Sequence, residues 1–295
     1  MGEAKQPLKR SYGMYRCVHS VERSSDGALY YALNSKTGQM VVLRTLTLRQ
    51  HDRENVQDLL RAQLDELQRL RVPHIIPIEE YGIQGDELYF ILPYHPKDTL
   101  AERFGHWQAQ AKLPSVGEVA LIVEHVAMAL EGLHQADIVH GQLAPRVITF
   151  DRQGDLNVCE YGLIRLMKIV YALDESNSFS VTHYSAPELW DGARPTPASD
   201  QYALACIAYE LLSGRPPYLA PNIAALMQAH HIQVAKPLQQ LRPELPVSLD
   251  FVFWQALAKP PERRFEQINA FSQAFRQAAQ EAPGEATGFY PLTSA

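Results

Sequence analysis

The chain has 295 residues and a net charge of −6, and 46% of its residues are hydrophobic against 20% charged. These values exclude wholesale disorder and a fibrous protein, and the length suits two modest domains or one two-lobed unit. No dense stripe of Lys and Arg interleaves with aromatic residues, so we expect neither nucleic acid nor an anionic lipid as a partner. The three cysteines are scattered without C-x-x-C spacing, which fits a reducing compartment rather than a disulfide framework or a zinc site.

The ends of the chain predict no targeting or anchoring segment. No apolar stretch like that of a signal peptide is present in the first residues, MGEAKQPLKRSYG. The most apolar run, residues 203–212, is too short to cross a membrane and carries Glu210. We therefore expect no membrane span and a cytoplasmic protein. Residues 1–14 and 279–295 are rich in polar and small residues or broken by Gly and Pro, and we interpret them as tails.

The first part of the chain, residues 15–93, predicts a small β-rich lobe with one helix. Strand patterns run through MVVLRTL and ELYFILPY, with Gly38 in the turn before the first of them. Residues 55–70 are the exception, because apolar residues recur there at spacings of three and four and predict an amphipathic helix that faces a core. These apolar residues are Val56, Leu59, Leu60, Leu64 and Leu67.

The second part, residues 94–278, predicts a larger and mainly helical lobe. The segment ITFDRQGDLNVCEYG is the exception and predicts a hairpin around a turn at residues 152–154. The helix at residues 199–213 is apolar nearly all round, so we expect it at the buried centre of this lobe. Helical periodicity appears in residues 116–135, 199–213, 223–230, 249–258 and 265–281. The two parts together predict an α+β fold of two lobes.

Local motifs identify this two-lobed pattern more closely. YSAPELW, SDQYALACIAYELLSGRPPY and ALAKPPERRF occur in this order and match the Ala-Pro-Glu segment, the central helix and the Pro-Glu-x-Arg motif of protein kinases. YYALNSKTGQMVVLRTL looks like the second and third strands of that family, and LRVPHIIPIEEYG looks like the segment after its regulatory helix. Over residues 15–278 the chain resembles a protein kinase domain, in the style of bacterial Ser/Thr kinases. The resemblance implies the bilobal kinase fold.

The resemblance assigns positions to the kinase machinery, which consists of a Gly-rich loop, a Lys–Glu pair, a catalytic Asp, and Asp and Asn ligands for magnesium. The Gly-rich loop falls on residues 22–27, where only Gly27 remains of its glycines. The strand Lys is replaced by Arg44, whose planar fork differs in shape from a compact ammonium. The helix Glu is replaced by Gln63, which cannot form the ion pair; Glu66 is the alternative if the register slips by three.

The catalytic loop departs furthest from the family. VHGQLAPRVITF places Gly141, Gln142, Ala144 and Val147 where kinases carry Arg, Asp, Lys and Asn. A neutral Gln142 cannot act as a general base, and Val147 offers no oxygen to a metal ion that requires oxygen ligands. Four functional side chains are therefore absent from one loop.

The magnesium-binding Asp-Phe-Gly motif becomes EYG at residues 160–162. Glu160 keeps a carboxylate on a longer side chain, and we favour a solvated carboxylate, or one paired with Arg44, over a weak metal ligand. We expect no cofactor; ATP bound without magnesium is the less favoured alternative, because residues 92–95 match the hinge whose backbone binds adenine. Val42 and Thr149 in the implied pocket count against ATP. The positions implied for a nucleotide are Gly27, Val42, Arg44, Pro93, His95, Thr149 and Glu160.

At positions with structural roles in the family, this chain carries residues that match the kinase pattern. Asp200 matches the residue that holds the catalytic loop, and Glu188 and Arg264 match a buried ion pair. Breaking such a pair typically costs about 3–5 kcal/mol. The positions that match the stack of side chains joining the two kinase lobes are Leu67, Ile78, His140 and Tyr161.

Two further features are weaker. Residues 163–185 correspond to the activation segment, but Gly141 replaces the Arg that would bind a phosphorylated loop, so we expect this switch to be uncoupled. The adjacent pair His230 and His231 has no metal-ligand spacing, and we interpret it as surface or packing. The hydroxyl residues available to an upstream kinase in the activation segment are Ser176, Ser178, Ser180 and Thr182.

The substitutions predict a pseudokinase, that is, a kinase homologue that is not an enzyme and acts as a protein-binding or allosteric module. Its expected partner is a protein, either an active kinase or the substrate of one. The alternative is an ATP-binding Ser/Thr protein kinase-like enzyme with residual or atypical nucleotide chemistry. A third possibility is a fold kept as structural support within an assembly.

Overall fold

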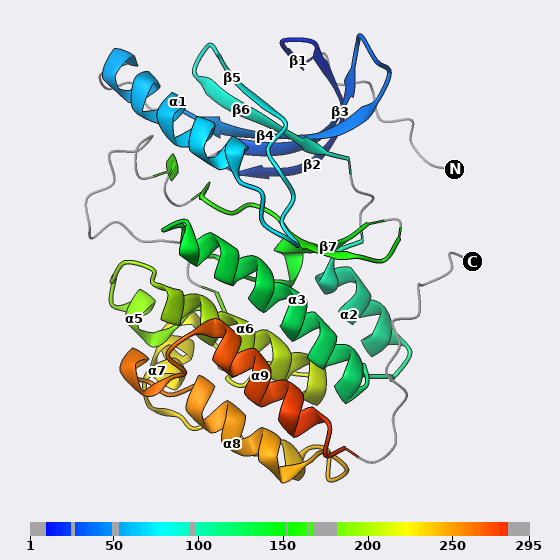
Figure 1. Ribbon diagram of the computed structural model, residues 1–295, viewed down its shortest axis with the longest axis vertical. Helices are drawn as coiled ribbons and strands as arrows, with labels where there is room; N and C mark the ends of the chain where they lie inside the picture. The colour runs from blue at the N-terminus through cyan, green and yellow to red at the C-terminus, as the bar shows by residue number, and fades with distance from the viewer. Residues whose placement is uncertain are drawn as a thin grey trace. The chain divides into compact units, whose positions relative to one another are not determined.

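The computed structural model describes residues 10–24, 27–48, 53–94, 98–151, 153–163, 166–167 and 182–282. These residues form two units (Figure 1). The first unit contains residues 10–71 and 76–94 with Leu166 and Met167, and the second contains residues 72–75, 98–163 and 182–282. The predicted division into a β-rich unit and a mainly helical unit is confirmed.

A six-stranded antiparallel sheet forms most of the first unit, in the order β1-β2-β3-β4-β6-β5. Buried and half-buried side chains alternate along much of β3, as expected for a strand with one face on a core. The strands are β1 (Ser11–Tyr12), β2 (Tyr15–Ser24), β3 (Gly27–Asn34), β4 (Met40–Thr47), β5 (Glu80–Gln84) and β6 (Glu87–Pro93).

Helix α1 (Arg53–Arg69) runs alongside this sheet and confirms the predicted helix (Figure 1). Leu60, Leu64 and Leu67 are buried and recur at i, i+4 and i+7, so they share one face. Leu59 is 57% exposed, and the prediction that it faces the core is wrong. It lies about 100° around the helix from Leu60, which places it beside the buried face rather than on it.

Part of the segment interpreted as an N-terminal tail belongs to the sheet. Tyr12 on β1 is 1% exposed and lies against the rings of Tyr30 and Tyr89. Its hydroxyl donates a hydrogen bond of 2.6 Å to Glu87. A tyrosine can bury its ring while its hydroxyl keeps a polar partner, so a strand of two residues is enough to attach the chain here.

Helices dominate the second unit, where α3 lies beside α6 and α9 (Figure 1). Helix α6 is buried along nearly its whole length, as predicted, and the predicted hairpin is confirmed as β7 and β8. The elements are α2 (Leu100–Ala109), α3 (Val116–Gln135), η1 (Pro145–Val147), β7 (Ile148–Phe150), β8 (Leu156–Val158), α5 (Pro187–Trp190), α6 (Pro197–Ser213), α7 (Ile223–Ile232), η2 (Leu238–Gln240), α8 (Val247–Ala256), η3 (Pro261–Arg263) and α9 (Ile268–Ala279).

The helix boundaries follow from local capping. Helix α2 is absent from the predicted elements, yet it begins with a capping box in which Thr99 and Glu102 satisfy each other's backbone N–H groups. Helix α6 starts two residues before the predicted position, because Thr196 caps it and Pro197 takes the first helical position, where a missing N–H costs nothing.

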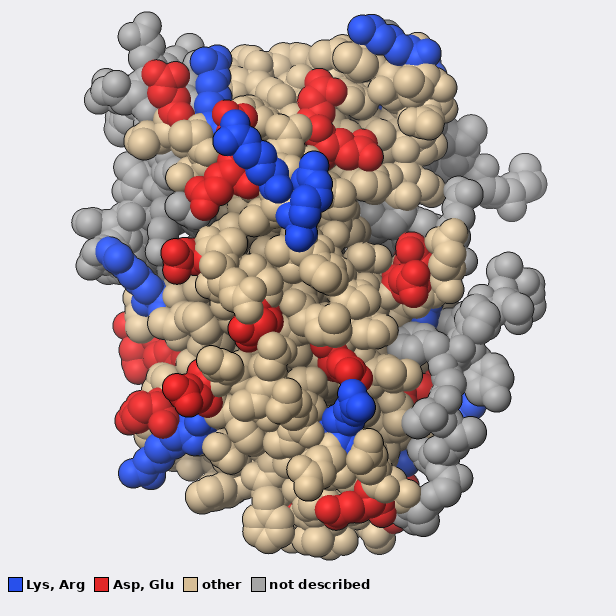
Figure 2. All heavy atoms as spheres, in the orientation of Figure 1, with Lys and Arg blue, Asp and Glu red and all other residues tan. Residues whose placement is uncertain are grey.

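Two features concern membrane insertion and surface charge. None of the helices among the described residues is long and apolar enough to cross a membrane. Figure 2 shows Lys and Arg side chains scattered among Asp and Glu over the described part of one face.

Gly27 gives a test of the sheet. It opens β3 at φ +152°, and a Cβ atom there would lie 1.9 Å from the carbonyl oxygen of Thr45 on β4. Because that oxygen belongs to the backbone, Gly27→Ala should lower the free energy of unfolding by about 3–4 kcal/mol, measured by urea denaturation. Gly38→Ala is the control, because its φ is +73° but no atom lies within 4 Å, and it should cost about 1–2 kcal/mol. Equal costs would contradict this account of Gly27.

Candidate active site

The loop that corresponds to the kinase catalytic loop is held from helix α6. Asp200 is 1% exposed and accepts hydrogen bonds from the backbone N–H groups of His140 (2.9 Å) and Gly141 (2.7 Å). The imidazole of His134 on α3 lies 2.8 Å from the same carboxylate. A buried carboxylate requires such donors, since burial without them is costly. Asp200 therefore fixes the backbone path of the loop.

His140 connects this loop to the segment before Glu160. Its Nε2 lies 3.1 Å from the carbonyl oxygen of Cys159, and its Nδ1 lies 3.3 Å from the backbone nitrogen of Gln142. The carbonyl can only accept and the amide can only donate, so Nε2 carries the proton and Nδ1 accepts. Burial lowers the pKa of His140, which keeps the imidazole neutral.

The other catalytic-loop positions contribute packing more than chemistry. Ala144 and Val147 are 5% and 1% exposed, so neither presents a functional group. Gln142 is half-buried and lines a small hollow together with Thr182 and Tyr184. Of these three loop positions, Gln142 is the one whose side chain can form polar contacts.

Glu160 forms an ion pair that the sequence did not indicate. Its carboxylate lies 2.9 Å from Nη1 of Arg146, and the Glu160 side chain is 11% exposed. The backbone of Glu160 has φ +63°, a left-handed conformation that is uncommon outside glycine. The Arg146 side chain is 49% exposed, and its Nη1 donates to Glu160. Sequence reasoning considered Arg44 as the partner; the structure shows that the loop itself supplies one in Arg146.

The remaining nucleotide positions of the first unit lie on the sheet. Arg44 is half-buried on β4, opposite Leu29 of β3 and Phe90 of β6. Val42 is buried two residues earlier on the same strand. Pro93 ends β6, and Gly27 opens β3. Ser25, Asp26 and His95 lie outside the described residues.

Gln63 and Glu66, the two candidates for the helix Glu of kinases, differ in burial on α1. Gln63 is half-buried, and its Oε1 is buried with no hydrogen-bond partner among the residues that the structure describes. Glu66 is exposed. This difference in burial agrees with the choice of Gln63 over Glu66 for the inward position.

Thr149 lies on β7 in the second unit and is 3% exposed. Its hydroxyl donates to the carbonyl oxygen of Asn157 on β8 at 3.4 Å. The hydroxyl is therefore engaged within the hairpin, which lowers the cost of burying it.

A magnesium ion held by the protein does not fit the residues present. The described part of the chain contains no group of three or more His, Cys, Asp or Glu side chains placed to hold a metal. Glu160 is paired with Arg146, and Val147 supplies no oxygen ligand.

The positions matched to structural roles are buried. Leu67 and Ile78 lie in the first unit, and His140 and Tyr161 lie in the second, each between 1% and 5% exposed. These burial values agree with core roles in both units.

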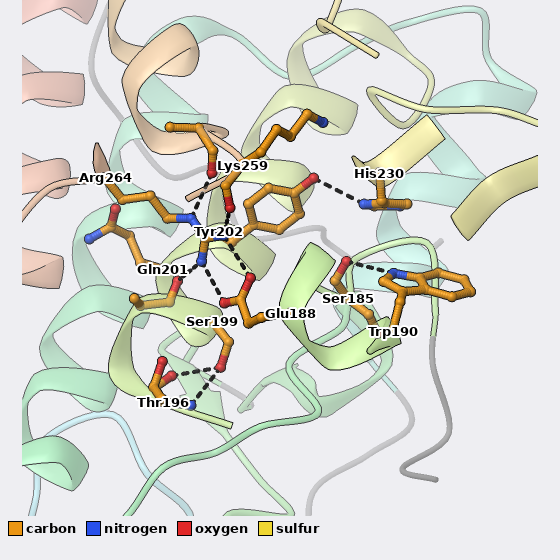
Figure 3. Close-up of polar contacts among 12 residues, drawn as sticks. Ser185, Glu188, Trp190, Thr196, Ser199, Gln201, Tyr202, His230, Lys259 and Arg264 are labelled. Carbon is orange, nitrogen blue, oxygen red and sulfur yellow. Dashed lines mark hydrogen bonds and ion pairs between the residues drawn. The ribbon is translucent and has the colours of Figure 1, made fainter. Parts of the chain in front are cut away.

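Glu188 and Arg264 form a bidentate ion pair with N–O distances of 2.7 and 2.8 Å (Figure 3). The Arg264 side chain is fully buried and also donates to three backbone carbonyl groups. Its guanidinium lies 4.8 Å from the centroid of the Tyr202 ring. All of its donor groups thus point at acceptors, which is what makes a buried ion pair tolerable. The three carbonyl groups are those of Ala198, Ala258 and Lys259.

His230 and His231 differ in environment although they are adjacent. His230 is fully buried among the rings of Trp190, Tyr202 and Tyr218, and the Tyr202 hydroxyl lies 3.0 Å from its Nδ1 (Figure 3). Burial lowers the pKa of His230 to about 3, with a smaller effect from the charge of Lys259. His231 is nearer the surface, 3.1 Å from Asp191. His230 is therefore a packing residue and His231 a surface residue.

The chain is similar in sequence to bacterial serine/threonine-protein kinases. The protein kinase domain family (Pkinase) matches residues 17–277. The serine/threonine-protein kinase PknD of Mycobacterium tuberculosis is 28% identical over 267 residues, which cover 90% of this chain and 40% of that protein. The serine/threonine-protein kinase PknE of Mycobacterium bovis is 26% identical, covering 95% of this chain and 49% of that protein. The chain therefore spans less than half the length of these relatives.

A solved structure shows the same fold. The crystal structure of the Mycobacterium tuberculosis PknI kinase domain is 25% identical, with a TM-score of 0.68. The match covers 91% of this chain and 98% of that chain. The two-unit architecture described above is therefore that of a kinase domain.

The prediction that the chain is not an enzyme is wrong. The matching family is the protein kinase domain, and the relatives are named as Ser/Thr protein kinases. The prediction rested on counting substituted side chains one at a time. It did not include Arg146, whose guanidinium places a positive charge against the carboxylate of Glu160.

Arg264→Met tests the buried ion pair. The substitution leaves the Glu188 carboxylate and three buried carbonyl groups without their donor, so the free energy of unfolding should fall by about 3–5 kcal/mol in urea denaturation. Arg276→Met is the control, because Arg276 is 57% exposed in its pair with Glu124 and should contribute less than about 1 kcal/mol. Similar losses in the two variants would contradict the assignment.

His230→Phe tests the neutral buried imidazole. The unfolded chain takes up a proton near pH 6.5 and native His230 only near pH 3, so stability should be lost as the pH falls through this range. The contribution reaches about 1.4 kcal/mol per pH unit. Thermal unfolding from pH 7 to pH 5 should therefore show a shallower decline in His230→Phe than in the parent, whereas His231→Phe should keep the parent slope. A parent slope in both variants would show that His230 titrates normally.

Proposed function

This chain belongs to the protein kinase family, and from that premise we propose that it is an ATP-binding Ser/Thr protein kinase-like enzyme with atypical nucleotide chemistry. The observation that carries the proposal is the ion pair between Arg146 and Glu160. By resemblance, Glu160 corresponds to the family's metal-binding carboxylate, and the pair therefore supports a role for the Arg146 guanidinium as the cation near the phosphates of a nucleotide.

A guanidinium is suited to phosphate. Its planar set of N–H donors matches phosphate oxygens in a bidentate manner, and it stays charged at every relevant pH. Fixed cations aimed at a transferring phosphoryl group stabilise the charge that develops on it. Arg146 uses Nη1 for Glu160 and is half-exposed, so it retains donors for a nucleotide.

Gln142 takes a positioning role in this proposal. Phosphoryl transfer passes through a loose transition state in which positioning and electrostatic stabilisation contribute most of the catalysis. The Oε1 atom of Gln142 can accept a hydrogen bond from an acceptor hydroxyl and orient it, although it cannot remove the proton. Loss of general-base catalysis predicts turnover about 10²–10⁴-fold below that of a kinase with Asp at this position.

The first unit supports nucleotide binding in two ways. Arg44 keeps a positive charge at the strand position of the kinase Lys, and it is half-buried rather than displaced into solvent. Strand β6 reaches Pro93 with its backbone in a regular antiparallel ladder, so the hinge groups expected to pair with adenine begin from an ordered strand.

The identity of the acceptor follows the relatives. PknD and PknE are named serine/threonine-protein kinases, and we infer a Ser or Thr hydroxyl of a protein as the acceptor. A protein partner, either an active kinase or the substrate of one, and a cytoplasmic location belong to the same proposal.

Calorimetric titration with ATP, in EDTA and then in magnesium, tests nucleotide binding. We expect saturable binding in EDTA that magnesium changes by less than about threefold, because Arg146 supplies the local cation. Arg146→Met should weaken binding about tenfold, whereas Arg276→Met should leave it unchanged. Glu160→Gln should bind ATP at least as tightly as the parent, since it frees Arg146 and removes a negative charge. Absence of saturable binding at about 5 mM ATP, or a strict requirement for magnesium, would overturn the proposal.

The same preparations are then used to measure transfer of the terminal phosphoryl group to a protein acceptor by mass spectrometry. Gln142→Ala should reduce the rate without changing ATP affinity, because its contact is with the acceptor. Binding of ATP with no transfer in the parent would reduce the proposal to nucleotide binding alone.

A further inference from the structure

A second pocket lies in the second unit, away from the residues discussed above as a nucleotide site. It has a volume of about 580 Å³, within the range of about 300–1,000 Å³ that holds small organic ligands. It is bordered by α8, by the segment that follows α7, and by the end of α6. Its apolar lining includes Tyr209, Tyr218, Val234, Phe253, Trp254 and Leu257.

Large apolar side chains are exposed at the border of this pocket. Helix α8 buries Leu249 and Phe253 but leaves Phe251 and Trp254 69% and 73% exposed. Val234, which also lines the pocket, is 78% exposed. Single exposed apolar residues are ordinary, but several that border one hollow mark a binding surface.

The charged residues of the pocket are mainly cations. Lys236, Lys259 and Arg263 line it, against the single carboxylate of Asp250. That carboxylate already accepts a hydrogen bond of 2.5 Å from the backbone N–H of Leu238. The pocket therefore has a surplus of positive charge beside its apolar surface.

Lys259 is the most constrained of these cations. Its Nζ lies 4.1 Å from the centroid of the Tyr218 ring and is buried, with no hydrogen-bond acceptor among the described residues. Figure 3 shows its side chain running away from the Glu188–Arg264 pair. Burial lowers the pKa of Lys259 to about 8, so at pH 7 the amine is still largely charged, and no carboxylate of the described residues forms an ion pair with it. Its flexible stem allows the amine to turn toward an anion in the pocket.

We propose that this pocket binds an amphipathic carboxylic acid, whose apolar body lies against Phe251, Phe253 and Trp254 and whose carboxylate pairs with Lys259 and Arg263. One anionic group is favoured over several, because the lining is mostly apolar and a polyphosphate would need more donors than the pocket offers. The site is independent of the proposed kinase activity.

Titration with sodium dodecanoate, with dodecan-1-ol as the uncharged probe of equal length, tests the proposal. Trp254 fluorescence should shift to shorter wavelength and saturate with dodecanoate, and dodecan-1-ol should bind about tenfold more weakly. The Trp254→Phe variant, which retains Trp107 and Trp190, should lose the spectral shift while calorimetry still detects binding. Trp254→Ala should weaken both probes alike, because it removes apolar contact and no charge.

Lys259→Met then separates the charge from the apolar surface. It keeps a chain of similar length and removes a poorly solvated charge, so the fold is retained, as measured by thermal unfolding. We expect this variant to lose most of the tenfold preference for dodecanoate over dodecan-1-ol, and Arg263→Met, as an independent variant, to reduce the preference as well. Lys236→Met is the matched control, since this exposed lysine of the same pocket should leave the preference intact. No saturation by about 1 mM dodecanoate, or an unchanged tenfold preference in Lys259→Met, would overturn the proposal.

Discussion

The second unit depends on one buried carboxylate. Asp200 lies on the buried helix α6 and accepts hydrogen bonds from the backbone of the loop at His140 and Gly141, while the imidazole of His134 on α3 contacts the same carboxylate. Asp200 thus holds the loop through main-chain groups, which any side chain at these positions would supply. Residues such as Gln142 and Val147 could therefore diverge from the kinase pattern without changing the path of the backbone, which explains how a kinase fold and an altered loop coexist.

The sequence predicted most of the elements because their physical signals are strong. Helix α3, the hairpin β7–β8 and the buried helix α6 each carry a clear period or turn. Helix α2 has only ten residues and a weaker pattern, but the Thr99-x-x-Glu102 capping box was readable in the sequence and marks its start. Leu59 was misassigned because adjacent leucines both fit a broad apolar stripe, and only tertiary packing decides which of the two is covered.

The candidate site rests on motif order for its positions, whereas its contacts could not be predicted from the sequence. The order of the motifs is what predicts kinase positions for Arg44, Gln142 and Glu160, and that assignment stays a prediction. The pairing of Glu160 with Arg146 joins residues 14 apart, and the backbone at Glu160 is left-handed; hydrophobic periodicity indicates neither feature. Motif comparison reports which side chains are substituted. It does not report that the guanidinium of Arg146 lies against the carboxylate of Glu160.

Strand β1 has a consequence for any shortened form of the chain. A version that began at Tyr15 would follow the apparent domain boundary, but it would remove Arg10 and Tyr12 and deprive Glu87 of both donors. The rings of Tyr30 and Tyr89 would lose the residue that covers them, and β2 would lose its pairing partners at Tyr15 and Arg16, which lengthens its unpaired edge. Such an edge pairs readily with other chains, so truncation there favours aggregation over a cleaner domain.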